Sequence, residues 1–310
     1  MENAQELHRN ALKLARNYSG DISWPTIALA LVVFPAYWSL PYLVMFYGLS
    51  LFIAIPVMIA LTYASYTVLH EAVHSNIHGK NESLQWINGV LGYLTATIIV
   101  IPQSPHRISH LIHHGNTNDK AVDPDVHIEH LFKSPKHMLY CVWEVVACQF
   151  RNYKDMRWAN ASLFENAVVV SEFCTAVFLR ILPFAVLFAF GDAESVARWW
   201  QGVVLFVVAG VIGTFVLLYL FAYAVHQPHA STERYQTTRT IVVSGPFSGI
   251  LDALWGYQNY HAVHHLFPSA PFYNYRRLFK AVAPTLDAMN APVYKLTWKG
   301  LERIRAAEAC

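Results

Sequence analysis

Histidine is the residue type in this sequence whose spacing could support metal chemistry, because it is concentrated in four short windows. Twelve of the sixteen histidines lie there, each window beside or just after a long apolar stretch. The windows contain His70, His74 and His78; His106, His110, His113 and His114; His226 and His229; and His261, His264 and His265. Neutral imidazole suits iron, copper, zinc and nickel. The clustering therefore predicts a metal site at the end of a bundle of membrane helices.

The spacing inside three windows places the imidazoles on one face of a helix. A helix turns by about 100° per residue, so His70, His74 and His78 fall within about 80° of one another. The histidines of the second window, and those of the HAVHH window, each fall within an arc of about 100°. A zinc site uses three or four protein ligands, so nine or more convergent histidines imply two metals. The isolated histidines are interpreted as ordinary interfacial or capping residues: His8, His127, His130 and His137.

The composition indicates a membrane protein. Of the 310 residues, 55% are hydrophobic and only 14% are charged, whereas a soluble domain is typically about 25% charged. The formal net charge of +2 is too small to indicate a nucleic-acid partner. The four cysteines form no CxxC pair, so neither a disulfide framework nor a thiolate zinc site is expected.

Four apolar stretches are long enough to cross a bilayer, which requires about 20 residues. The expected spans are residues 25–41, 44–69, 167–190 and 199–225, with Pro41 as the turn between the first two. These stretches predict an all-α integral membrane domain with four transmembrane helices in two hairpins.

Two shorter apolar pieces, 88–101 and 241–256, are expected to be re-entrant or interfacial segments. Inside the third span, Arg180 follows Glu172 by eight residues, so the two side chains can share a helix face. Ionisable residues at this depth usually face the bundle interior. We expect a buried ion pair, a span that begins only after Arg180, or a polar contact for a substrate head group.

Lys and Arg are distributed unevenly between the segments that connect the spans. Three precede the first span, eight lie between the second and third, and nine follow the fourth, whereas the link between the third and fourth holds one. Cytoplasmic segments carry the excess of Lys and Arg, so both termini are expected in the cytoplasm. Residues 1–310 are interpreted as a single domain, with an N-terminal amphipathic leader (1–23) and a cytoplasmic helical cap formed by 70–165 and 226–310. Every histidine window then lies on the cytoplasmic side.

One window also fits a different metal chemistry. The sequence HEAVH at residues 70–74 matches HExxH, in which two histidines bind zinc and the glutamate, here Glu71, is the general base of a metalloprotease. With Asp252 as third ligand it predicts an intramembrane zinc protease, but this leaves five histidines without a role. A metal transporter would have ligands near the bilayer midplane and repeated halves, and neither feature is visible.

With their flanking residues, the windows resemble those of the membrane fatty acid desaturase and hydroxylase superfamily. HEAVHSNIHG, RISHLIHHGNTNDKAVDPDV and QNYHAVHHLFPSAPFYNY are similar to its three histidine boxes, HxxxH, HxxHH and HxxHH. The likeness runs from about residue 60 to residue 280. It implies a four-helix membrane bundle whose cytoplasmic cap encloses two iron ions, with dioxygen as co-substrate.

Carried over residue by residue, the resemblance implies nine metal ligands. The three boxes and the end of the fourth span supply them: His70 and His74; His110, His113 and His114; His226; and His261, His264 and His265. Some relatives place an asparagine one turn before the fourth-span histidine to hold a metal-bound water, and Ala222 occupies that position here. The candidates for groups that orient the ligands are His78, His106, His229, Asp123, Asp125 and Glu71.

The implied activity is that of a non-haem diiron membrane oxidoreductase of lipid metabolism, a desaturase or a monooxygenase. It would oxidise an unactivated C–H bond of a fatty acyl lipid, by desaturation or hydroxylation. Carotenoid ring hydroxylases and ketolases, which use the same chemistry, are the alternative. The chain has no haem or flavin motif, so an external electron donor of the ferredoxin, rubredoxin or cytochrome type, with its reductase, is implied. Arg276, Arg277 and Lys280 could dock it or contact anionic lipid, and the expected location is the bacterial inner membrane.

Overall fold

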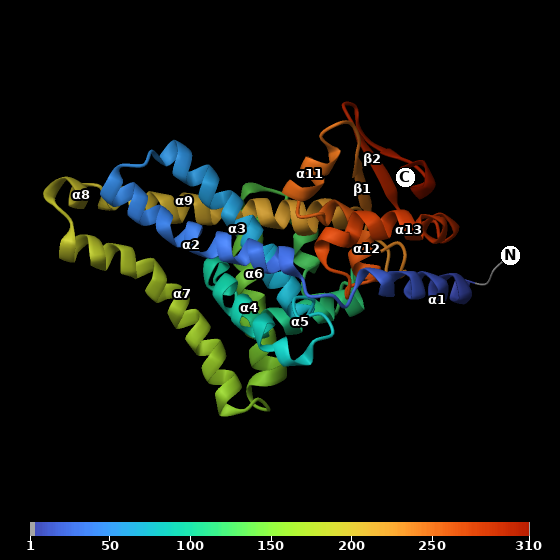
Figure 1. Ribbon diagram of the computed structural model, residues 1–310, viewed down its shortest axis with the longest axis horizontal. Coiled ribbons are helices and arrows are strands. Elements are labelled where there is room, and N and C mark those ends of the chain that lie inside the picture. Colours follow the sequence, from blue (N-terminus) through green and yellow to red (C-terminus); the bar gives the residue numbers. More distant parts are fainter. Residues whose placement is uncertain (1–3, 310) are drawn as a thin grey trace.

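The computed structural model describes residues 4–309 and is a helical membrane bundle that continues into a cap (Figure 1). Four helices are long and apolar enough to cross a membrane: α2 (Trp24–Tyr47), α3 (Leu51–Val73), α7 (Leu163–Phe190) and the continuous helix Trp199–His226. The last comprises α9 (Trp199–Leu217), a π-helical segment (Leu218–Tyr223) and α10 (Ala224–His226). The predicted fold class is confirmed, and the chain is an integral membrane protein.

The first hairpin turns later than the sequence predicts. Pro41 lies buried inside α2, which continues to Tyr47 and is capped by Gly48 in the left-handed region, with φ of 67°. Ser50 then caps α3 by accepting a hydrogen bond from the backbone N–H of Phe52. The predicted turn at Pro41 is wrong, because a bundle in a membrane can satisfy the backbone groups that a proline frees.

Between the two hairpins, the chain makes a sharp bend inside the bundle. A 3-10 turn (Glu82–Leu84) leads into α4 (Trp86–Ile99), which is followed after three residues by α5 (Gln103–Asn116). The two helical segments meet at 90°, as a re-entrant loop or a broken span. Helix α5 carries four histidines.

Two ionisable side chains of α7 bind the helix ends at this break. Arg180 donates to the carbonyl oxygens of Thr97 and Ile98, near the end of α4, at 2.9 and 2.7 Å. Glu172 Oε1 accepts a hydrogen bond of 3.1 Å from the backbone N–H of Gln103, where α5 begins. Helix ends leave carbonyl and N–H groups without intrahelical partners, and unpaired groups are costly inside a bilayer. Helix α7 thus supplies a donor to one end and an acceptor to the other.

This arrangement corrects the expectations for these two residues. Among the described residues, no ion pair joins Glu172 to Arg180, because each side chain is used by a backbone group. The span begins at Leu163 rather than after Arg180. A contact between Arg180 and a substrate head group remains a prediction.

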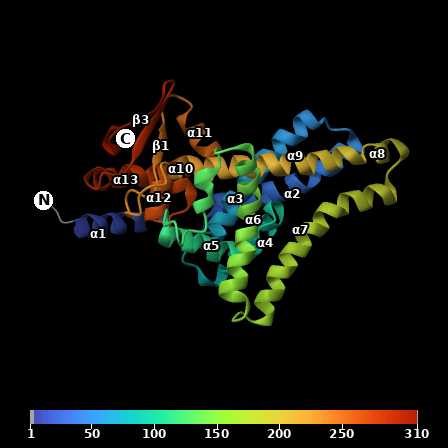
Figure 2. The same cartoon turned by 180° about the vertical axis from the view of Figure 1, so that it is seen from behind.

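The remaining elements form the return to α7, the link between α7 and α9, and the cap. They are a 3-10 turn (Val126–His130), α6 (Pro135–Tyr153) with a π-helical turn (Lys154–Trp158), the outer helix α8 (Ala193–Ala197), α11 (Ser248–Leu254), α12 (His261–Leu266) and α13 (Tyr275–Ala288). Further 3-10 turns are Arg16–Tyr18, Gln258–Tyr260, Phe272–Asn274 and Ala306–Ala309. Seen from behind, the cap and α8 lie at opposite ends of the spans (Figure 2).

A small sheet in the cap was not foreseen from the sequence. Strand β1 (Thr240–Val243) pairs in parallel with β2 (Val293–Thr297), which pairs in antiparallel fashion with β3 (Gly300–Arg303). The apolar piece 241–256 is therefore divided between the buried strand β1 and α11, whose Ile250 and Leu254 are exposed.

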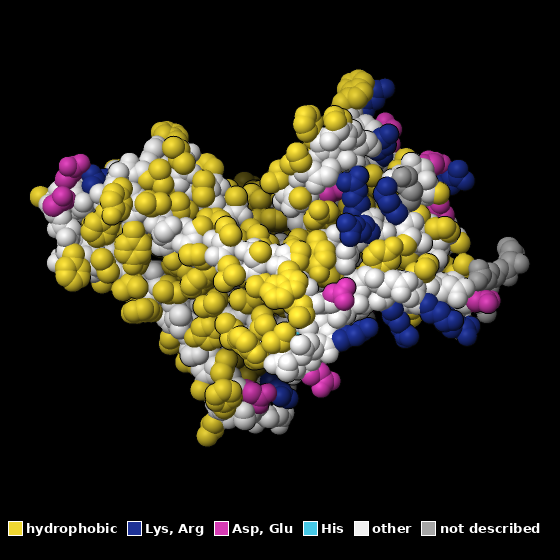
Figure 3. Space-filling model, viewed as in Figure 1, with side chains coloured by type: hydrophobic (Ala, Val, Ile, Leu, Met, Phe, Trp, Pro, Cys, Tyr) yellow, Lys and Arg dark blue, Asp and Glu magenta, His cyan; other side chains and the backbone are white. Residues whose placement is uncertain are grey.

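The N-terminal leader is helix α1 (Ala4–Ala15), and it belongs to the core of the cap. Its Ala11 and Ala15 are buried in the cluster that also holds Leu278 and Phe279 of α13. In Figure 3, hydrophobic side chains cover the visible flank of the spans, whereas Lys and Arg gather over the cap and along α1. The bundle has a separate core, so the histidine helices lie where two hydrophobic cores meet.

Candidate metal centre

Nine histidines from four helices converge at the boundary between the spans and the cap. They come from the end of α3 (His70 and the C-cap His74), from α5 (His110, His113 and His114), from α10 (His226) and from α12 (His261, His264 and His265). These are the nine residues that the sequence nominated as ligands, and their ring nitrogens fall into two groups.

The first histidine group holds five residues whose ring nitrogens all lie within 4.8 Å of one another: His70, His74, His110, His114 and His264. Nε2 of His110 lies 2.9 Å from Nε2 of His74 and 3.1 Å from Nε2 of His114. Nε2 of His114 lies 2.9 Å from Nε2 of His264. The rings thus point their Nε2 atoms at a common centre.

The second histidine group is built around His261. Nε2 of His261 lies 2.9 Å from Nε2 of His226 and 3.1 Å from Nε2 of His265. A ring nitrogen of His113 lies within 4.8 Å of those of His226 and His265. Four imidazoles therefore share a second centre next to the first.

In the second group, the Nδ1 atoms lie on the outer side of the rings, and their hydrogen bonds determine which ring nitrogen carries the proton. The Nδ1–H of His261 donates to Gln258 Oε1 at 2.9 Å. Nδ1 of His265 lies 3.2 Å from the Thr117 hydroxyl, which donates its own proton to the carbonyl oxygen of His113, so His265 must be the donor. In a neutral imidazole the other nitrogen then carries a lone pair. Two lone pairs, on Nε2 of His261 and of His265, face each other at 3.1 Å, an arrangement that repels unless a cation lies between them.

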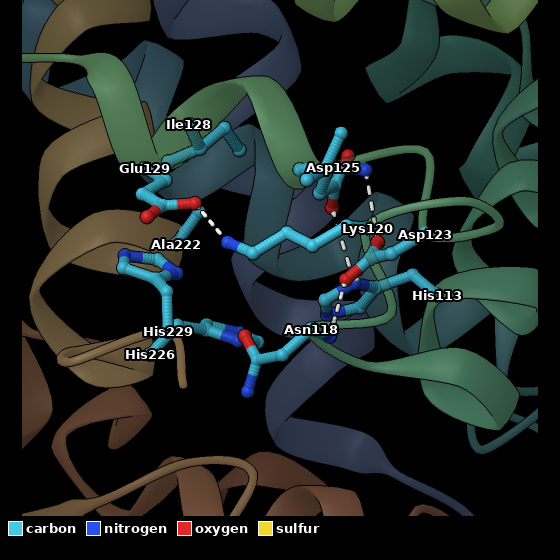
Figure 4. Close-up of a pocket in the computed structure, with 11 residues that line it drawn as sticks. His113, Asn118, Lys120, Asp123, Asp125, Ile128, Glu129, Ala222, His226 and His229 are labelled. Carbon is cyan, nitrogen blue, oxygen red and sulfur yellow. Dashed lines mark hydrogen bonds and ion pairs between the residues drawn. The ribbon is translucent and has the colours of Figure 1, made fainter. Parts of the chain in front are cut away.

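A carboxylate holds the outer nitrogen of a third ring of this group. Nδ1 of His113 donates to Asp123 Oδ1 at 2.8 Å and lies 3.7 Å from Asp125 (Figure 4). Asp123 Oδ2 also accepts from the backbone N–H of Asn118. Burial alone would lower the pKa of His113, but the contacts with Asp123 and Asp125 outweigh it and raise that pKa. Carboxylate–histidine pairs of this kind orient metal ligands and increase their basicity.

The first group has fewer such partners. Nδ1 of His264 contacts the Tyr275 hydroxyl at 2.7 Å. Both ring nitrogens of His70 and the Nδ1 of His114 are buried without a hydrogen-bond partner among the described residues. Burial lowers the pKa of His74 to about 3, with the charge of Arg107 as a further cause. Burial, followed by neighbouring imidazoles, also holds the pKa values of His110, His114 and His264 well below the usual value. These rings are neutral and offer lone pairs.

The nitrogen positions fit transition-metal ions. Imidazole nitrogens lie about 2.1 Å from such an ion, so two that bind at right angles lie about 3.0 Å apart. The observed separations in both groups are 2.9 and 3.1 Å. Buried polar atoms are rarely left unpaired, and a bound cation would satisfy those of His70. The sets of five and four imidazoles suit two metal ions of the iron, copper, zinc or nickel kind.

The residues nominated to orient the ligands are placed differently from one another. Asp123 and Asp125 contact His113, as described. His106 is buried with its ring centroid 5.3 Å from that of His110. The ring of His229 stacks against His226 with the centroids 6.1 Å apart.

His78 and Glu71 lie outside both groups. The extrapolation of the helix to His78 is wrong, because α3 ends at Val73 and the ring of His78 contacts the Asn88 side chain. Glu71 is fully buried near Asn76 and Phe272. The side chains of both residues therefore contact residues other than the nine histidines.

Asp252, the third ligand of the protease interpretation, is in another part of the cap. It accepts a hydrogen bond from Asn259 at 2.8 Å and forms an ion pair with Arg276 at 3.2 Å. It belongs to neither histidine group. This geometry does not favour a zinc protease.

Three residues that contact the histidines were missed from the sequence: Gln258, Thr117 and Tyr275. Gln258 lies three residues before His261, and Thr117 lies three residues after His114, so spacing offered a weak signal for both. Tyr275 comes from a separate helix, and only the fold brings it to His264.

A small cavity borders the histidine groups, and a larger groove lies among the membrane helices. A cavity of about 40 Å³, here called the reaction cavity, is bounded by His110, His113, His226 and His261 together with apolar residues that include Tyr66, Ile101, Leu217 and Phe221. A groove of about 340 Å³, the membrane groove, is lined by Val142, Val146, Phe206, Val207 and Arg180, among others. A third space of about 10 Å³ lies beside Ala222, His226 and His229, as Figure 4 shows, and has room for about one water molecule.

Known proteins with similar sequences act on fatty acids. The family model described as fatty acid desaturase matches residues 49–297. A Delta(9) fatty acid conjugase-like enzyme of Dimorphotheca sinuata is 24% identical over 267 residues, covering 74% of this chain and 69% of that protein. An sn-1 acyl-lipid omega-3 desaturase (ferredoxin) of Synechocystis sp. is 26% identical over 236 residues, or 69% and 63% of the two chains. An endoplasmic reticulum omega-3 fatty acid desaturase of Nicotiana tabacum is 23% identical over 235 residues, or 69% and 60%.

Proposed function

The chain belongs to the fatty acid desaturase family, and from this premise we propose that it uses dioxygen to oxidise a fatty acyl lipid at a centre of two iron ions. The names of the similar proteins, desaturases and a conjugase, favour the introduction of a double bond over hydroxylation. An acyl-lipid substrate is favoured over a carotenoid for the same reason.

The first histidine group would hold one iron and the second group the other. One observation supports this assignment. Gln258 and Thr117 bind the Nδ1–H groups of His261 and His265, so the Nε2 lone pairs of these two residues face each other. A bound cation would remove the repulsion between these lone pairs. Neutral imidazole suits iron, and the family membership supports iron over the other metals.

The iron ions would supply the activation of dioxygen that removing hydrogen from a saturated carbon requires, since that hydrogen is not acidic. The protein residues position the imidazoles and exclude water. Asp123, Gln258 and Thr117 keep the imidazole proton at Nδ1, which leaves each Nε2 free to bind metal. Tyr66 and Phe221 give the reaction cavity an apolar wall, which suits a methylene chain rather than water.

The acyl chain would reach the reaction cavity from the membrane groove. Helix α6 lines both hollows, the groove with Val142 and Val146 and the cavity with Val145. The segment at the end of α4 does the same, with Ile98 in the groove and Ile101 in the cavity. An apolar path between these walls would place a mid-chain carbon beside both histidine groups.

We place the cap, both termini and the metal centre on the cytoplasmic side, in a bacterial inner membrane. The excess of Lys and Arg in residues 70–165 and 226–310 supports this orientation. A reporter fused after Cys310 should be accessible only from the cytoplasm. Accessibility only from outside would refute the orientation.

The activity is tested by lipid and pigment analysis of cells that express the chain. The wild type should introduce double bonds into membrane acyl chains, and the His264→Ala variant should introduce none. A changed carotenoid profile with unaltered acyl chains would contradict the proposed substrate.

A further inference from the structure

Two of the nine histidines connect the metal centre with an open cleft. His114 and His265 are half-buried and both line the same cleft, whose volume is about 660 Å³. His114 belongs to the first histidine group and His265 contacts His261 in the second. Their rings stack with the centroids 4.1 Å apart and the planes 13° from parallel. A single stacked pair therefore joins both groups to the cleft.

The proposed reaction requires electrons from outside the substrate. Dioxygen takes up four electrons and four protons when it becomes two water molecules. A CH2–CH2 unit that becomes CH=CH gives up two electrons and two protons. Two more electrons must come from a donor, and two protons from solvent, in each turnover. The donor must approach the metal centre closely, because electron transfer slows steeply with distance.

Residues of the N-terminal helix α1 form part of the wall of the cleft. His8 and Leu12 of α1 line the cleft opposite the loop that follows α5. The ring of His8 is hydrogen-bonded through Nδ1 to the Tyr235 hydroxyl at 2.8 Å, and through Nε2 it accepts from Arg234 at 2.7 Å. These bonds tie α1 to the opposite rim, so the leader helps to form the opening.

Basic side chains slightly outnumber acidic ones around this rim. Arg9 and Lys13 of α1 are exposed, as is Arg16 in the 3-10 turn that follows it, and Arg234 lines the cleft itself. Carboxylates also occur nearby: Asp119 lines the cleft, and Glu6 and Glu233 are exposed close to it in the sequence. A cationic rim steers an acidic partner during the diffusional encounter.

We propose that this cleft is the docking site of a small acidic one-electron carrier protein, and that electrons enter through the stacked pair of His114 and His265. The proposal rests on the proposed function and adds the site of its partner. It replaces the basic residues of α13 as the docking surface. Arg276 forms an ion pair with Asp252, and the pocket it lines with Lys280 and Lys295 includes none of the nine histidines.

The test compares two charge-reversal variants of the full chain in nanodiscs of uncharged phosphatidylcholine. One, called the α1 variant, carries Arg9→Glu, Lys13→Glu and Arg16→Glu, on α1 and the turn that follows it. The control carries Arg277→Glu, Lys280→Glu and Lys299→Glu, the same change of net charge on another exposed face of the cap. The probe is a purified acidic [2Fe–2S] ferredoxin, whose Kd is measured at several salt concentrations.

The α1 variant should bind the ferredoxin about tenfold or more weakly at low salt, since steering by a charged surface is worth 10- to 1,000-fold in association rate. It should also lose most of the salt dependence of wild-type binding. The control should bind like the wild type. Cross-links from the bound ferredoxin should fall on α1 and residues 232–237. Equal effects of both variants, or weakening by the control alone, would overturn the proposal.

Turnover with a photoreduced small dye separates this proposal from the proposed function. If the wild type forms no oxidised acyl product with the dye, the proposed function fails, whereas the Kd comparison still decides the docking site. A wild-type Kd that neither variant changes shows that the ferredoxin does not use the cleft.

Discussion

The two histidine groups differ in what holds their rings. In the second group, the outer nitrogens of His113, His261 and His265 donate to Asp123, Gln258 and Thr117. In the first group, His264 contacts Tyr275, but His70 has no hydrogen-bond partner among the described residues. Outer hydrogen bonds fix the tautomer and the orientation of an imidazole. The second group is therefore organised by the protein, whereas the first relies on packing and on the metal itself.

The largest effect should follow from removing one proposed ligand of either group. His264→Ala and His265→Ala should each abolish turnover, because dioxygen activation needs both metal ions held correctly. Glu71→Gln is the matched control from the first box, and it should keep measurable oxidation because Glu71 lies outside both groups. Product analysis and metal content measure the outcome. A dead Glu71→Gln protein beside an active, folded His264→Ala protein would show that the ligands are wrongly assigned.

The next largest effect should come from the partner that organises the second group. Asp123→Asn keeps an acceptor for His113 but removes the charge, and loss of such a partner typically costs about 10- to 100-fold in metal affinity or activity. The loss should be confined to one metal ion per chain. Titration of the metal content with a chelator distinguishes the two groups. Equal loss of metal from both groups would contradict the conclusion that outer hydrogen bonds organise the second group more than the first.

A substitution at the break between α4 and α5 should weaken metal binding by both histidine groups, because α5 contributes histidines to each. Glu172→Met leaves the N–H of Gln103 unpaired, at a cost of about 1–3 kcal/mol for a buried donor. Glu172→Gln keeps an oxygen acceptor and should restore most of the metal content. The readouts are thermal unfolding in detergent and metal content. If the Met and Gln variants lose metal equally, Glu172 does not act through Gln103.

The smallest effect is expected for Tyr275→Phe in the first group. It removes one hydrogen bond to His264, which is worth about 0.5–1.5 kcal/mol, and leaves the aromatic ring in place. Activity and metal affinity should fall less than in Asp123→Asn. A larger loss than in Asp123→Asn would show that the first group also depends on its outer partner.

Hydropathy, a local property, was sufficient to predict the four spans, and the resemblance of the histidine boxes nominated the nine histidines that the fold brings together. Prediction from the sequence failed where tertiary contacts determine where a helix ends. Pro41 continues a helix because the bundle supports it, and His78 leaves the helix because α3 ends at Val73.

The same limit applies to the polar residues. Glu172 and Arg180 share a face of α7, as spacing predicts, but their partners lie on α4 and α5. The division of the histidines into groups was also invisible, since His113 and His114 are neighbours in the sequence and belong to different groups.

The iron content of the purified wild-type protein, measured together with its activity, tests the two-metal centre most directly. The two imidazole groups predict about two iron ions per chain, and activity that falls in step with their removal and returns when iron is restored. A preparation that is fully active with one zinc ion and no iron would contradict the account.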